Sequence, residues 1–367
     1  MNKTLGIIGG GQLGKMIALS AKAMGFIVAT LDPDPDCPAK GVSDIFVESS
    51  FDNPLKLSSF CQKCDFVTYE FENIPYRLIE GLEKKFNIPQ GHKPLYYSQN
   101  RLVEKNAALN LGIKTAKFLA IKSYEELISK YQEIGLPAVL KTIEGGYDGH
   151  GQVVLRNETD LENGKKLLEN QECILEEFLV FEKELSIISA RSTKGETAFF
   201  PVSENVHKDN ILFTSTVPAN ISKEIEQEAK KIASKVLDGL SLIGTLAIEF
   251  FLKDGTLYFN EMAPRPHNSG HYTIEGCETS QFEQHVRSVT GMTLGNTKLI
   301  QPTVMINLLG DDVKLLDKLS QTKAFKDIKI HLYGKKSIRH KRKMGHLTFI
   351  NYNLEESLKI YKENNHE

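Results

Sequence analysis

A glycine-rich segment near the start of the chain, GIIGGGQLGK (Gly6–Lys15), limits the possible folds most strongly. An apolar run precedes the turn, and Gly9, Gly11 and Gly14 satisfy the spacing G-x-G-x-x-G before a helix-like run begins. Glycines at this spacing allow a tight turn between a strand and a helix, and the amides of the turn can bind a phosphate group. The segment therefore predicts a strand–turn–helix unit that opens an α/β domain.

The first part of the chain alternates between strand-like and helix-like segments. Helix-like Lys15–Met24 ends at Gly25, and strand-like Ile27–Leu31 and Phe66–Tyr69 follow. Short strands separated by helix-length segments predict a parallel sheet with helices on its faces. The segment Ser98–Gly112 is typical of a capped helix with a C-terminal glycine, and we expect it to lead into a second domain.

The middle of the chain, Ile113–Leu294, mixes strands and helices less regularly. Its clearest helix is Ser222–Leu240, whose apolar residues fall on one face and predict packing against a core. Two apolar strands follow, Gly244–Leu252 and Gly255–Ala263, and the letters KDG between them indicate a hairpin. The remainder, Ile300–Glu367, predicts short strands with two flanking helices.

Composition excludes several classes of protein. At 367 residues the chain is long enough for two or three domains, and a formal charge of -2 gives no general reason to bind nucleic acid or an anionic membrane. We find no pattern of a signal peptide or of a membrane span. The five cysteines favour a reducing cytoplasm, and Cys61 and Cys64 lack the second ligand pair that a zinc site needs.

The predicted hairpin carries two carboxylates in apolar strands, Glu249 and Glu261. A buried carboxylate is strongly unfavourable unless a positive group meets it. If Asp254–Thr256 form a three-residue loop, the two glutamates lie opposite each other with Cβ atoms about 5 Å apart, which suits Mg²⁺. A two-residue turn would instead place Asn260 opposite Glu249 and turn Glu261 away.

A second glycine-rich stretch, KTIEGGYDGHGQ (Lys141–Gln152), lies between one strand ending in Lys141 and another beginning near Val153. The backbone amides of such a loop can close over phosphates. The stretch lacks the G-K-[ST] ending of a P-loop, and a plain hairpin loop is the alternative.

A stiff loop follows the second glutamate in NEMAPRPHNSGHYT (Asn260–Thr273). Two prolines fix its backbone, and it presents Arg265, His267 and Asn268. An arginine beside a magnesium site can neutralise charge on a transferring phosphoryl group. A charged surface loop is the alternative.

Six segments, taken in order, resemble those of the ATP-grasp superfamily, and specifically its 5-(carboxyamino)imidazole ribonucleotide synthetase family. They are GGGQLG, TYEFENIP, GGYDGHGQ, EEFLVFEKELS, FNEMAPRPHNSGH and the basic segment Arg342–His346. The resemblance covers essentially the whole chain. It implies a mixed α/β and α+β fold, with a Rossmann-like pre-ATP-grasp domain over residues 1–97. It then implies a two-lobed ATP-grasp domain over 98–298, with a lid lobe at about 115–180. A small β-rich C-terminal domain is implied over 299–367.

The resemblance also implies the reaction. ATP would drive the carboxylation of 5-aminoimidazole ribonucleotide by bicarbonate, through carboxyphosphate, in purine biosynthesis. ATP and Mg²⁺ would be the cofactors, with Glu249 and Glu261 as metal ligands. A cytoplasmic homodimer acting on small molecules, without nucleic acid or membrane partners, is expected.

ATP is implied between the two lobes of the middle domain, with Lys141 and Arg101 on its phosphates. Glu184 is implied on the ribose and the segment Glu176–Leu179 on adenine. The loop Gly146–Gln152 would act as a lid. The residues implied in ATP binding are Arg101, Lys141, Gly146, Tyr147, Asp148, Gly149, His150, Gly151, Gln152, Glu176, Glu177, Phe178, Leu179, Glu184, His207, Asn260 and Glu261.

The ribonucleotide is implied across the N-terminal domain, with its phosphate on the amides of Gln12 and Leu13 and its ribose on Glu70. The basic residues implied in clamping the phosphate are Lys335, Arg342 and Lys343. We prefer Lys335 to Lys336 because it follows the letters YG.

The residues implied in catalysis are Lys141, Tyr147, Asp148, Arg265, His267 and Asn268. Lys141 and Arg265 would stabilise developing charge, and Asp148 or the leaving phosphate would accept the proton of the amine. Many family members carry arginine where His150 stands. A histidine donates a similar hydrogen bond only when suitably protonated, so activity is expected to fall more steeply above neutral pH.

Two other enzyme classes fit parts of the sequence. A nicotinamide-dependent oxidoreductase would use the first glycine turn and Asp32, but it leaves Glu249, Glu261 and Arg265 unexplained. A formate-dependent ATP-grasp transformylase acting on glycinamide ribonucleotide shares the fold. The tyrosine and aspartate of GGYDGHGQ favour the carboxylating branch instead. A catalytically inactive scaffold is disfavoured because the lysine, both glutamates and the arginine are all present.

Overall fold

The computed structural model describes residues 3–146 and 151–365. The N-terminal part is a sheet of four parallel strands in the order β3-β2-β1-β4. Its strands are β1 (Thr4–Ile8), β2 (Ile27–Asp32), β3 (Ile45–Glu48) and β4 (Phe66–Tyr69). Its helices are α1 (Gln12–Ala23), α2 (Pro54–Cys61), α3 (Tyr76–Glu83) and α4 (Lys93–Ser98), with a 3-10 turn at Lys40–Val42. The predicted parallel α/β arrangement is confirmed.

The helix expected over Ser98–Gly112 is interrupted near its start. Helix α4 ends at Ser98, and α5 (Arg101–Asn110) begins after Asn100. The side-chain oxygen of Asn100 accepts hydrogen bonds from the amides of Leu102 and Val103. A capping side chain satisfies amides that the first helical turn leaves unpaired. The helix therefore starts at a different cap from the predicted one, and the chain turns toward the middle domain between α4 and α5.

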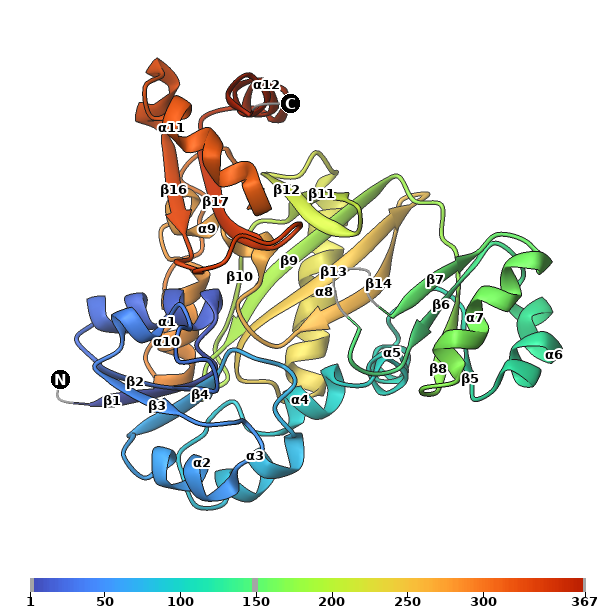
Figure 1. Cartoon of the computed structure of the whole chain (residues 1–367), viewed down its shortest axis with the longest axis horizontal. Coiled ribbons are helices and arrows are strands. Elements are labelled where there is room, and N and C mark those ends of the chain that lie inside the picture. The colour runs from blue at the N-terminus through green and yellow to red at the C-terminus, as the bar shows by residue number, and fades with distance from the viewer. Residues whose placement is uncertain (1–2, 147–150, 366–367) are drawn as a thin grey trace.

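A second sheet forms a small lobe, drawn in green in Figure 1. Its strands are antiparallel in the order β5-β8-β6-β7. They are β5 (Phe118–Ile121), β6 (Ala138–Thr142), β7 (Gln152–Leu155) and β8 (Cys173–Glu177). Helices α6 (Tyr124–Ile134) and α7 (Leu161–Leu168) cover one face, and a 3-10 turn lies at Glu158–Asp160. The second glycine-rich stretch joins β6 to β7, as predicted.

The remaining strands form one large sheet in the order β14-β13-β9-β11-β12-β15-β17-β16, with β10 beside β9. They are β9 (Lys183–Arg191), β10 (Thr197–Phe199), β11 (Ser203–Lys208), β12 (Ile211–Val217), β13 (Gly244–Lys253), β14 (Thr256–Ala263), β15 (Thr303–Leu309), β16 (Ile328–Leu332) and β17 (Lys343–Ile350). Because β12 pairs with β15, the C-terminal strands extend the central sheet.

Five helices accompany this sheet. They are α8 (Lys223–Gly239), α9 (Thr273–Gly276), α10 (Gln281–Thr290), α11 (Leu316–Leu319) and α12 (Leu354–Asn364), with 3-10 turns at Asn268–Gly270, Gly310–Leu315 and Lys323–Asp327. Helix α8 confirms the prediction over Ser222–Leu240: Ser222 caps it, and Ala233 and Val236 lie on its buried face. The two helices predicted near the C-terminus correspond to α11 and α12.

Helix α10 joins the N-terminal sheet to the large sheet. Its residues Phe282, Val286 and Val289 share one buried cluster with Leu5 and Ile17. Figure 1 shows α1 and α10 side by side beneath the large sheet, and the two helices are in contact. Since apolar burial is the main stabilising contribution to such contacts, the two parts are joined by a common core.

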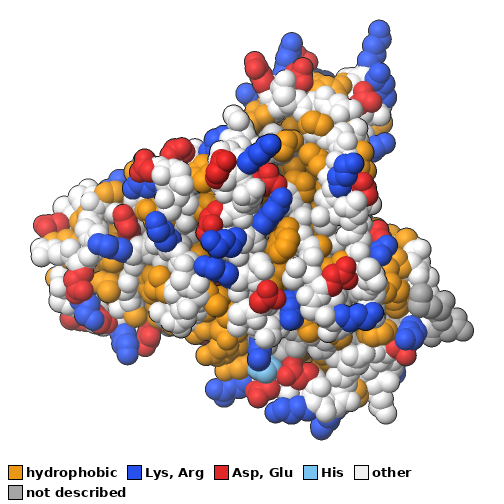
Figure 2. Space-filling model, turned by 180° about the vertical axis from the view of Figure 1, so that it is seen from behind, with side chains coloured by type: hydrophobic (Ala, Val, Ile, Leu, Met, Phe, Trp, Pro, Cys, Tyr) orange, Lys and Arg blue, Asp and Glu red, His pale blue; other side chains and the backbone are white. Residues whose placement is uncertain are grey.

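The surface carries both signs of charge. Figure 2 shows Lys and Arg side chains interspersed with Asp and Glu over the rear face, with hydrophobic side chains between them. Within residues 3–146 and 151–365, the helices are too short or too polar to cross a bilayer.

Gly14→Ala is expected to destabilise the protein by about 1–3 kcal/mol, because overpacking forces the backbone to move. A Cβ at this position would lie 2.4 Å from the carbonyl oxygen of Gly9. Gly81→Ala in α3 is the matched control: it meets no atom within 4 Å, and alanine stabilises a helix by about 0.4–1 kcal/mol relative to glycine. Urea unfolding measures both, and a Gly14→Ala variant as stable as the parent would contradict the close approach.

Candidate active site

The β13–β14 hairpin brings two carboxylates together through a β-bulge. Its turn contains two residues, Asp254 and Gly255, so the expected three-residue loop is wrong. The register then shifts so that Asn260 is the extra residue and Glu249 lies opposite Glu261. A bulge adds one residue to one strand and changes which side chains face each other. The glutamates therefore meet as predicted, although the turn length alone predicted the opposite.

The facing carboxylates repel each other. Burial, followed by the charge of Glu261, raises the pKa of Glu249 to about 7. A carboxyl group is held in its protonated form by a low dielectric and a like charge, and a bound cation would ionise it. In the described part of the chain, no group of three or more His, Cys, Asp or Glu side chains is placed to hold a metal. Mg²⁺ prefers carboxylate and phosphate oxygens, so two facing carboxylates fit an ion that completes its coordination with nucleotide phosphates.

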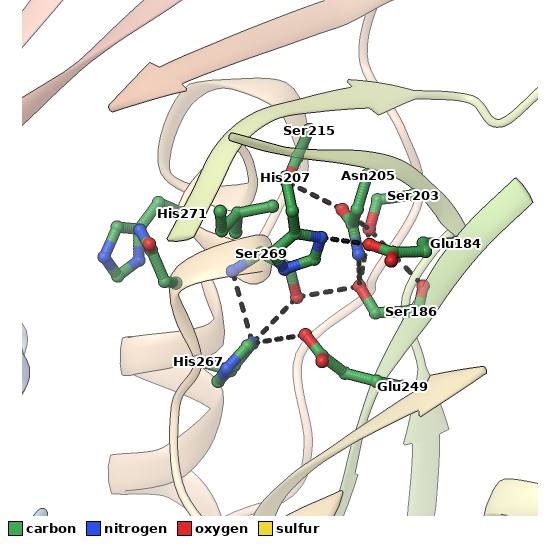
Figure 3. Close-up of polar contacts among 12 residues, drawn as sticks. Glu184, Ser186, Ser203, Asn205, His207, Ser215, Glu249, His267, Ser269 and His271 are labelled. Carbon is green, nitrogen blue, oxygen red and sulfur yellow. Dashed lines mark hydrogen bonds and ion pairs between the residues drawn. The ribbon is translucent and has the colours of Figure 1, made fainter. Parts of the chain in front are cut away.

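Glu184 and His207 lie beside this pair and contact each other across strands β9 and β11 (Figure 3). Burial lowers the pKa of His207, but the hydrogen bond to Glu184 and the charges of Glu184, Glu249 and Glu261 outweigh it and raise the pKa above its usual value. The imidazole therefore balances part of the negative charge. The structure brings these two predicted residues to the same end of the sheet as the carboxylate pair.

A lysine pair surrounds Glu176 on strand β8. The Nζ atom of Lys141 lies 2.8 Å from its Oε2, and the Nζ atom of Lys105 lies 3.4 Å from its Oε1. Burial raises the pKa of Glu176, but the charges of Lys141 and Lys105 outweigh it and hold the pKa at about 2. Glu176, which the resemblance assigned to adenine, thus forms ion pairs with two lysines of the protein. Because Lys105 comes from α5, this contact joins α5 to the small lobe.

Helix α5 also supports the second carboxylate strand. The Oε1 atom of Glu104 accepts a hydrogen bond of 2.6 Å from the amide of Met262, directly after Glu261. Burial, followed by the charge of Glu261, raises the pKa of Glu104 well above its usual range. A second acidic side chain beside Glu261 is therefore held in its protonated form by burial and by the neighbouring carboxylate.

Arg101 holds the beginning of the glycine-rich loop. Its guanidinium donates hydrogen bonds to the carbonyls of Thr142 at 2.7 Å and Gly146 at 3.0 Å. Such bonds fix the backbone at the beginning of the loop. Where resemblance implied phosphate contacts for Arg101, the structure shows it on the loop backbone.

His267 lies at the end of a chain of polar side chains (Figure 3). Its Nδ1 atom is bonded to the Ser269 hydroxyl at 2.9 Å and lies 3.8 Å from Oε1 of Glu249. Ser186 bonds to Ser269 at 2.7 Å and accepts from the amide of Asn205 at 3.0 Å. Burial, followed by nearby cations, lowers the pKa of His267 well below its usual range. We assign a neutral imidazole with its proton on Nε2, since the backbone amide of Ser269 can only donate and bonds to Nδ1 at 3.3 Å.

The other two residues of this loop have separate partners. Asn268 is buried and exchanges side-chain hydrogen bonds of 3.0 and 2.7 Å with Asn307. The Nε atom of Arg265 lies 2.9 Å from Oε1 of Glu72, which belongs to the N-terminal part. Asn268 therefore fixes the loop, and Arg265 lies at the junction between two parts of the protein.

The first glycine turn is occupied by carboxylates of the protein itself. The amide of Gly10 donates to Asp32 at 2.6 Å, and the amide of Gly11 donates to Glu70 at 2.8 Å. Burial raises the pKa of Glu70, and the bond from Gly11 is the largest contribution that opposes this. These are amides that a dinucleotide would need. The motif therefore forms the predicted turn without offering a full dinucleotide site.

The first turn of α1 faces the end of β16. Lys15 donates from Nζ to the carbonyls of Leu332 at 3.0 Å and Tyr333 at 3.3 Å. Within the described chain no protein acceptor is found for the amides of Gln12 and Leu13. Amides at a helix N-terminus attract a phosphate group. The phosphate contacts of these two residues stay a prediction, and their amides have no protein acceptor in the described chain that would compete.

The basic segment after β16 closes the same region. Lys335 donates from Nζ to the carbonyl of Lys343 at 2.9 Å. Lys336 instead pairs with Asp36 at 2.5 Å, and Arg342 is bonded to Ser337 within the segment. Lys335 and Lys336 thus point to different neighbours, although their roles toward a phosphate stay a prediction.

Four predicted residues lie outside the described residues: Tyr147, Asp148, Gly149 and His150. On either side, Gly146 accepts the bond from Arg101, Gly151 adopts φ +73, and Gln152 pairs with Lys141. Farther along, Phe178 is half exposed and Leu179 is buried, between the small lobe and β9. Glu177 lies on β8 next to Glu176.

Sequence reasoning missed four charged residues of this region: Lys15, Glu72, Glu104 and Lys105. Glu104 and Lys105 are adjacent in a predicted helix, where charged side chains usually face water. Only their burial, 3% and 2% exposed, marks them as part of the site.

Three known families of domains match successive parts of the chain. Family profiles match residues 1–99 (ribonucleotide synthetase preATP-grasp domain), 106–282 (ATP-grasp domain) and 303–359 (phosphoribosylaminoimidazole carboxylase C-terminal domain). The N5-carboxyaminoimidazole ribonucleotide synthase of Bacillus subtilis is 48% identical over 347 residues, 94% of this chain and 91% of the relative. The chain belongs to the N5-carboxyaminoimidazole ribonucleotide synthase family. It is thus an ATP-grasp ligase, as the resemblance implied.

Solved structures of N5-carboxyaminoimidazole ribonucleotide synthases agree. The Staphylococcus aureus enzyme complexed with ADP has a TM-score of 0.94 at 42% identity, covering 99% of this chain and 96% of the other. The Aspergillus clavatus enzyme, in complex with ADP and 5-aminoimidazole ribonucleotide, has a TM-score of 0.91 at 28% identity, covering 99% and 97%. The predicted family is confirmed, and it argues against the oxidoreductase and the formate-dependent transformylase.

Glu176→Gln is expected to destabilise the protein by about 3 kcal/mol, because breaking a buried pair leaves uncompensated charge. The loss should shrink as pH falls from 4.5 toward 2, since the folded-state pKa of Glu176 lies below its usual value. Glu177→Gln on the same strand is the control, because Glu177 is half-buried and has no ion pair with any described residue. Equal stabilities of the two variants would contradict the ion-pair assignment.

Glu249→Gln is expected to stabilise the Mg²⁺-free protein at pH 8 by about 1–3 kcal/mol, because it removes a buried like charge. The advantage should fade as pH falls from 7 to 4.5, where the folded protein holds the extra proton. Thermal unfolding across pH measures this, and Glu48→Gln at an exposed strand end is the control. A less stable Glu249→Gln variant at pH 8 would show that the pair is not repulsive.

Proposed function

We propose that this chain carboxylates 5-aminoimidazole ribonucleotide with bicarbonate and ATP, giving N5-carboxyaminoimidazole ribonucleotide, ADP and phosphate. One observation carries the proposal: Arg265, next to the carboxylate pair, forms an ion pair with Glu72, two residues from Glu70. The groups suited to a triphosphate and those suited to a ribonucleotide therefore adjoin. A transfer between two substrates requires such proximity.

The reaction has two balanced steps. A bicarbonate oxygen attacks the γ-phosphorus of ATP, the bond to the β-phosphate oxygen breaks, and carboxyphosphate and ADP form. The exocyclic amine then forms a bond to the carbon of carboxyphosphate, phosphate leaves, and the amine loses a proton. The leaving phosphate or Asp148 accepts that proton.

The residues of the site manage the charge of these steps. Lys141, next to Glu176, would meet the phosphates from the small lobe, and Arg265, next to Glu72, would meet them from the junction. Mg²⁺, when held by Glu249 and Glu261, supplies further positive charge to the phosphate oxygens. The neutral His267 offers an Nε2 proton as a hydrogen-bond donor to bicarbonate.

Three further features belong to the proposal. Mg²⁺ binding is supported by the facing carboxylates and the raised pKa of Glu249. A homodimer and a cytoplasmic location are proposed from the family resemblance, and the five unpaired cysteines fit a reducing compartment. Tyr147 and Asp148 are proposed to orient the amine, and the glycine-rich loop is proposed to exclude water from carboxyphosphate.

The deciding experiment measures phosphate release from Mg-ATP with bicarbonate, with and without 5-aminoimidazole ribonucleotide, while the acid-labile carbamate is followed in parallel. Release that requires the ribonucleotide and matches carbamate formation supports the proposal. Stimulation by glycinamide ribonucleotide and formate instead would contradict it.

Lys141→Met is expected to lower kcat about 100-fold, because one charged donor to a developing anion is removed. Lys165→Met, also on the small lobe but with its side chain 52% exposed, is the control and should leave kcat unchanged. Unaltered turnover by Lys141→Met would exclude Lys141 from phosphoryl transfer.

A further inference from the structure

The loop Pro264–His267 is held at both ends by buried amide side chains. Gln281 exchanges two hydrogen bonds with the backbone of His267, at 2.8 and 2.7 Å. At the other end, Gln90 donates from Nε2 to the carbonyl of Pro264 at 2.8 Å. Gln281 is 0% exposed and Gln90 is 3% exposed. Arg265 lies between these two anchors.

Gln90 is the last side chain of a longer chain of hydrogen bonds. The amide of Thr245 donates to Nδ1 of His285 at 3.2 Å, and Nε2 of His285 bonds to the hydroxyl of Thr68 at 2.8 Å. The Thr68 hydroxyl donates to Oε1 of Gln90 at 2.7 Å. All three side chains are buried, and Thr68 and His285 are 0% exposed. Buried polar groups of this kind are costly to leave unpaired.

The direction of every bond in this chain is fixed by its two ends. A backbone amide can only donate, so Nδ1 of His285 is an acceptor and the proton of the neutral ring is on Nε2. A carbonyl can only accept, so the NH₂ group of Gln90 faces Pro264. Thr68 then accepts from His285 and donates to Gln90. Burial lowers the pKa of His285 to about 3, which keeps the ring neutral.

The chain crosses three parts of the fold. Thr68 lies on β4, two residues before Glu70, and Gln90 follows α3. His285 lies on α10, one helical turn after Gln281, so one helix serves both anchors of the loop. The ion pair between Glu72 and Arg265 crosses the same junction. The N-terminal part thus contacts the loop in two ways, at the backbone carbonyl of Pro264 and at the side chain of Arg265.

We infer that Thr68, Gln90 and His285 are positioning residues for the reaction: they fix the Pro264 carbonyl, and with it Arg265, relative to the end of β4 that carries Glu70. The inference rests on the proposed function, since it assigns ATP to one side of this junction and the ribonucleotide to the other. When Arg265 is correctly positioned relative to Glu70, carboxyphosphate forms within reach of the amine. When that position is lost, carboxyphosphate decomposes in water before the amine reacts.

A role in folding alone would predict a different result. Removal of the chain would then lower stability, while each folded molecule would still make one carbamate for each phosphate released. A positioning role predicts that phosphate release exceeds carbamate formation. The ratio of the two products is therefore the deciding quantity, and thermal unfolding is measured in parallel.

The test compares the intact protein with Gln90→Leu, Thr68→Val and Thr68→Ser. Thr68→Val removes the hydroxyl with little change of shape, and Thr68→Ser keeps it. We expect Gln90→Leu and Thr68→Val to lower kcat about 10- to 100-fold with little change in KM for ATP, because displacement of a reacting group reduces the rate more than binding. The phosphate-to-carbamate ratio should rise above one, and Thr68→Ser should restore both values toward those of the parent.

Asn87→Ala is the matched control, because Asn87 also donates from a side-chain amide to a backbone carbonyl, that of Asp65, at 2.9 Å but on the surface. It should keep the parent kcat and ratio. If Gln90→Leu fails to fold, the Thr68 pair decides. Folded Thr68→Val with parent kcat and a ratio of one overturns the inference and leaves the proposed function intact.

A ¹⁵N-histidine spectrum separates the inference from the proposed function. His285 should show a proton on Nε2 that exchanges slowly, and Thr68→Val should alter that signal. If the parent protein forms no carbamate, the proposed function fails, and this signal alone tests the hydrogen-bond chain. A His285 ring protonated on Nδ1 would overturn the chain itself.

Discussion

The central region depends on two carboxylates that one β-bulge holds face to face. Glu249 and Glu261 repel each other, and the buried carboxyl group of Glu104 accepts a hydrogen bond from the amide directly after Glu261. The protein alone compensates this charge incompletely, through His207 and its raised pKa. Raised carboxyl pKa values at one place are typical of sites that bind a cation. The carboxylates suit a cation, and the lysines and arginine around them suit a polyphosphate.

The N-terminal turn shows that a motif can specify backbone geometry without specifying the ligand. Gly10 and Gly11 form the turn expected of a dinucleotide fold, yet Asp32 and Glu70 accept their hydrogen bonds. A carboxylate in this position repels a pyrophosphate and leaves only the next helical amides for a single phosphate. The same sequence pattern therefore forms the turn here without offering a full dinucleotide site.

Helix α10 explains why the separate parts act as one site. Its apolar face shares a core with the N-terminal sheet, and its polar face holds the loop that carries Arg265. The loop position is thereby tied to the packing of two domains. Because close-packed cores transmit displacements rather than absorb them, a change at Thr68 or Gln90 reaches the reacting groups.

The sequence by itself determined the parallel N-terminal sheet, the helix over Ser222–Leu240, the β6–β7 loop and the family. These follow from periodicity, turn chemistry and ordered motifs, which are local. Tertiary structure alone decided the bulge at Asn260, the lysine pair around Glu176 and the hydrogen bonds of Gln90. Each depends on residues far apart in the chain. The sequence does not distinguish a charged or amide side chain that is solvated from one that is buried. Burial gives such groups their partners and their pKa values, and burial exists only in the folded chain.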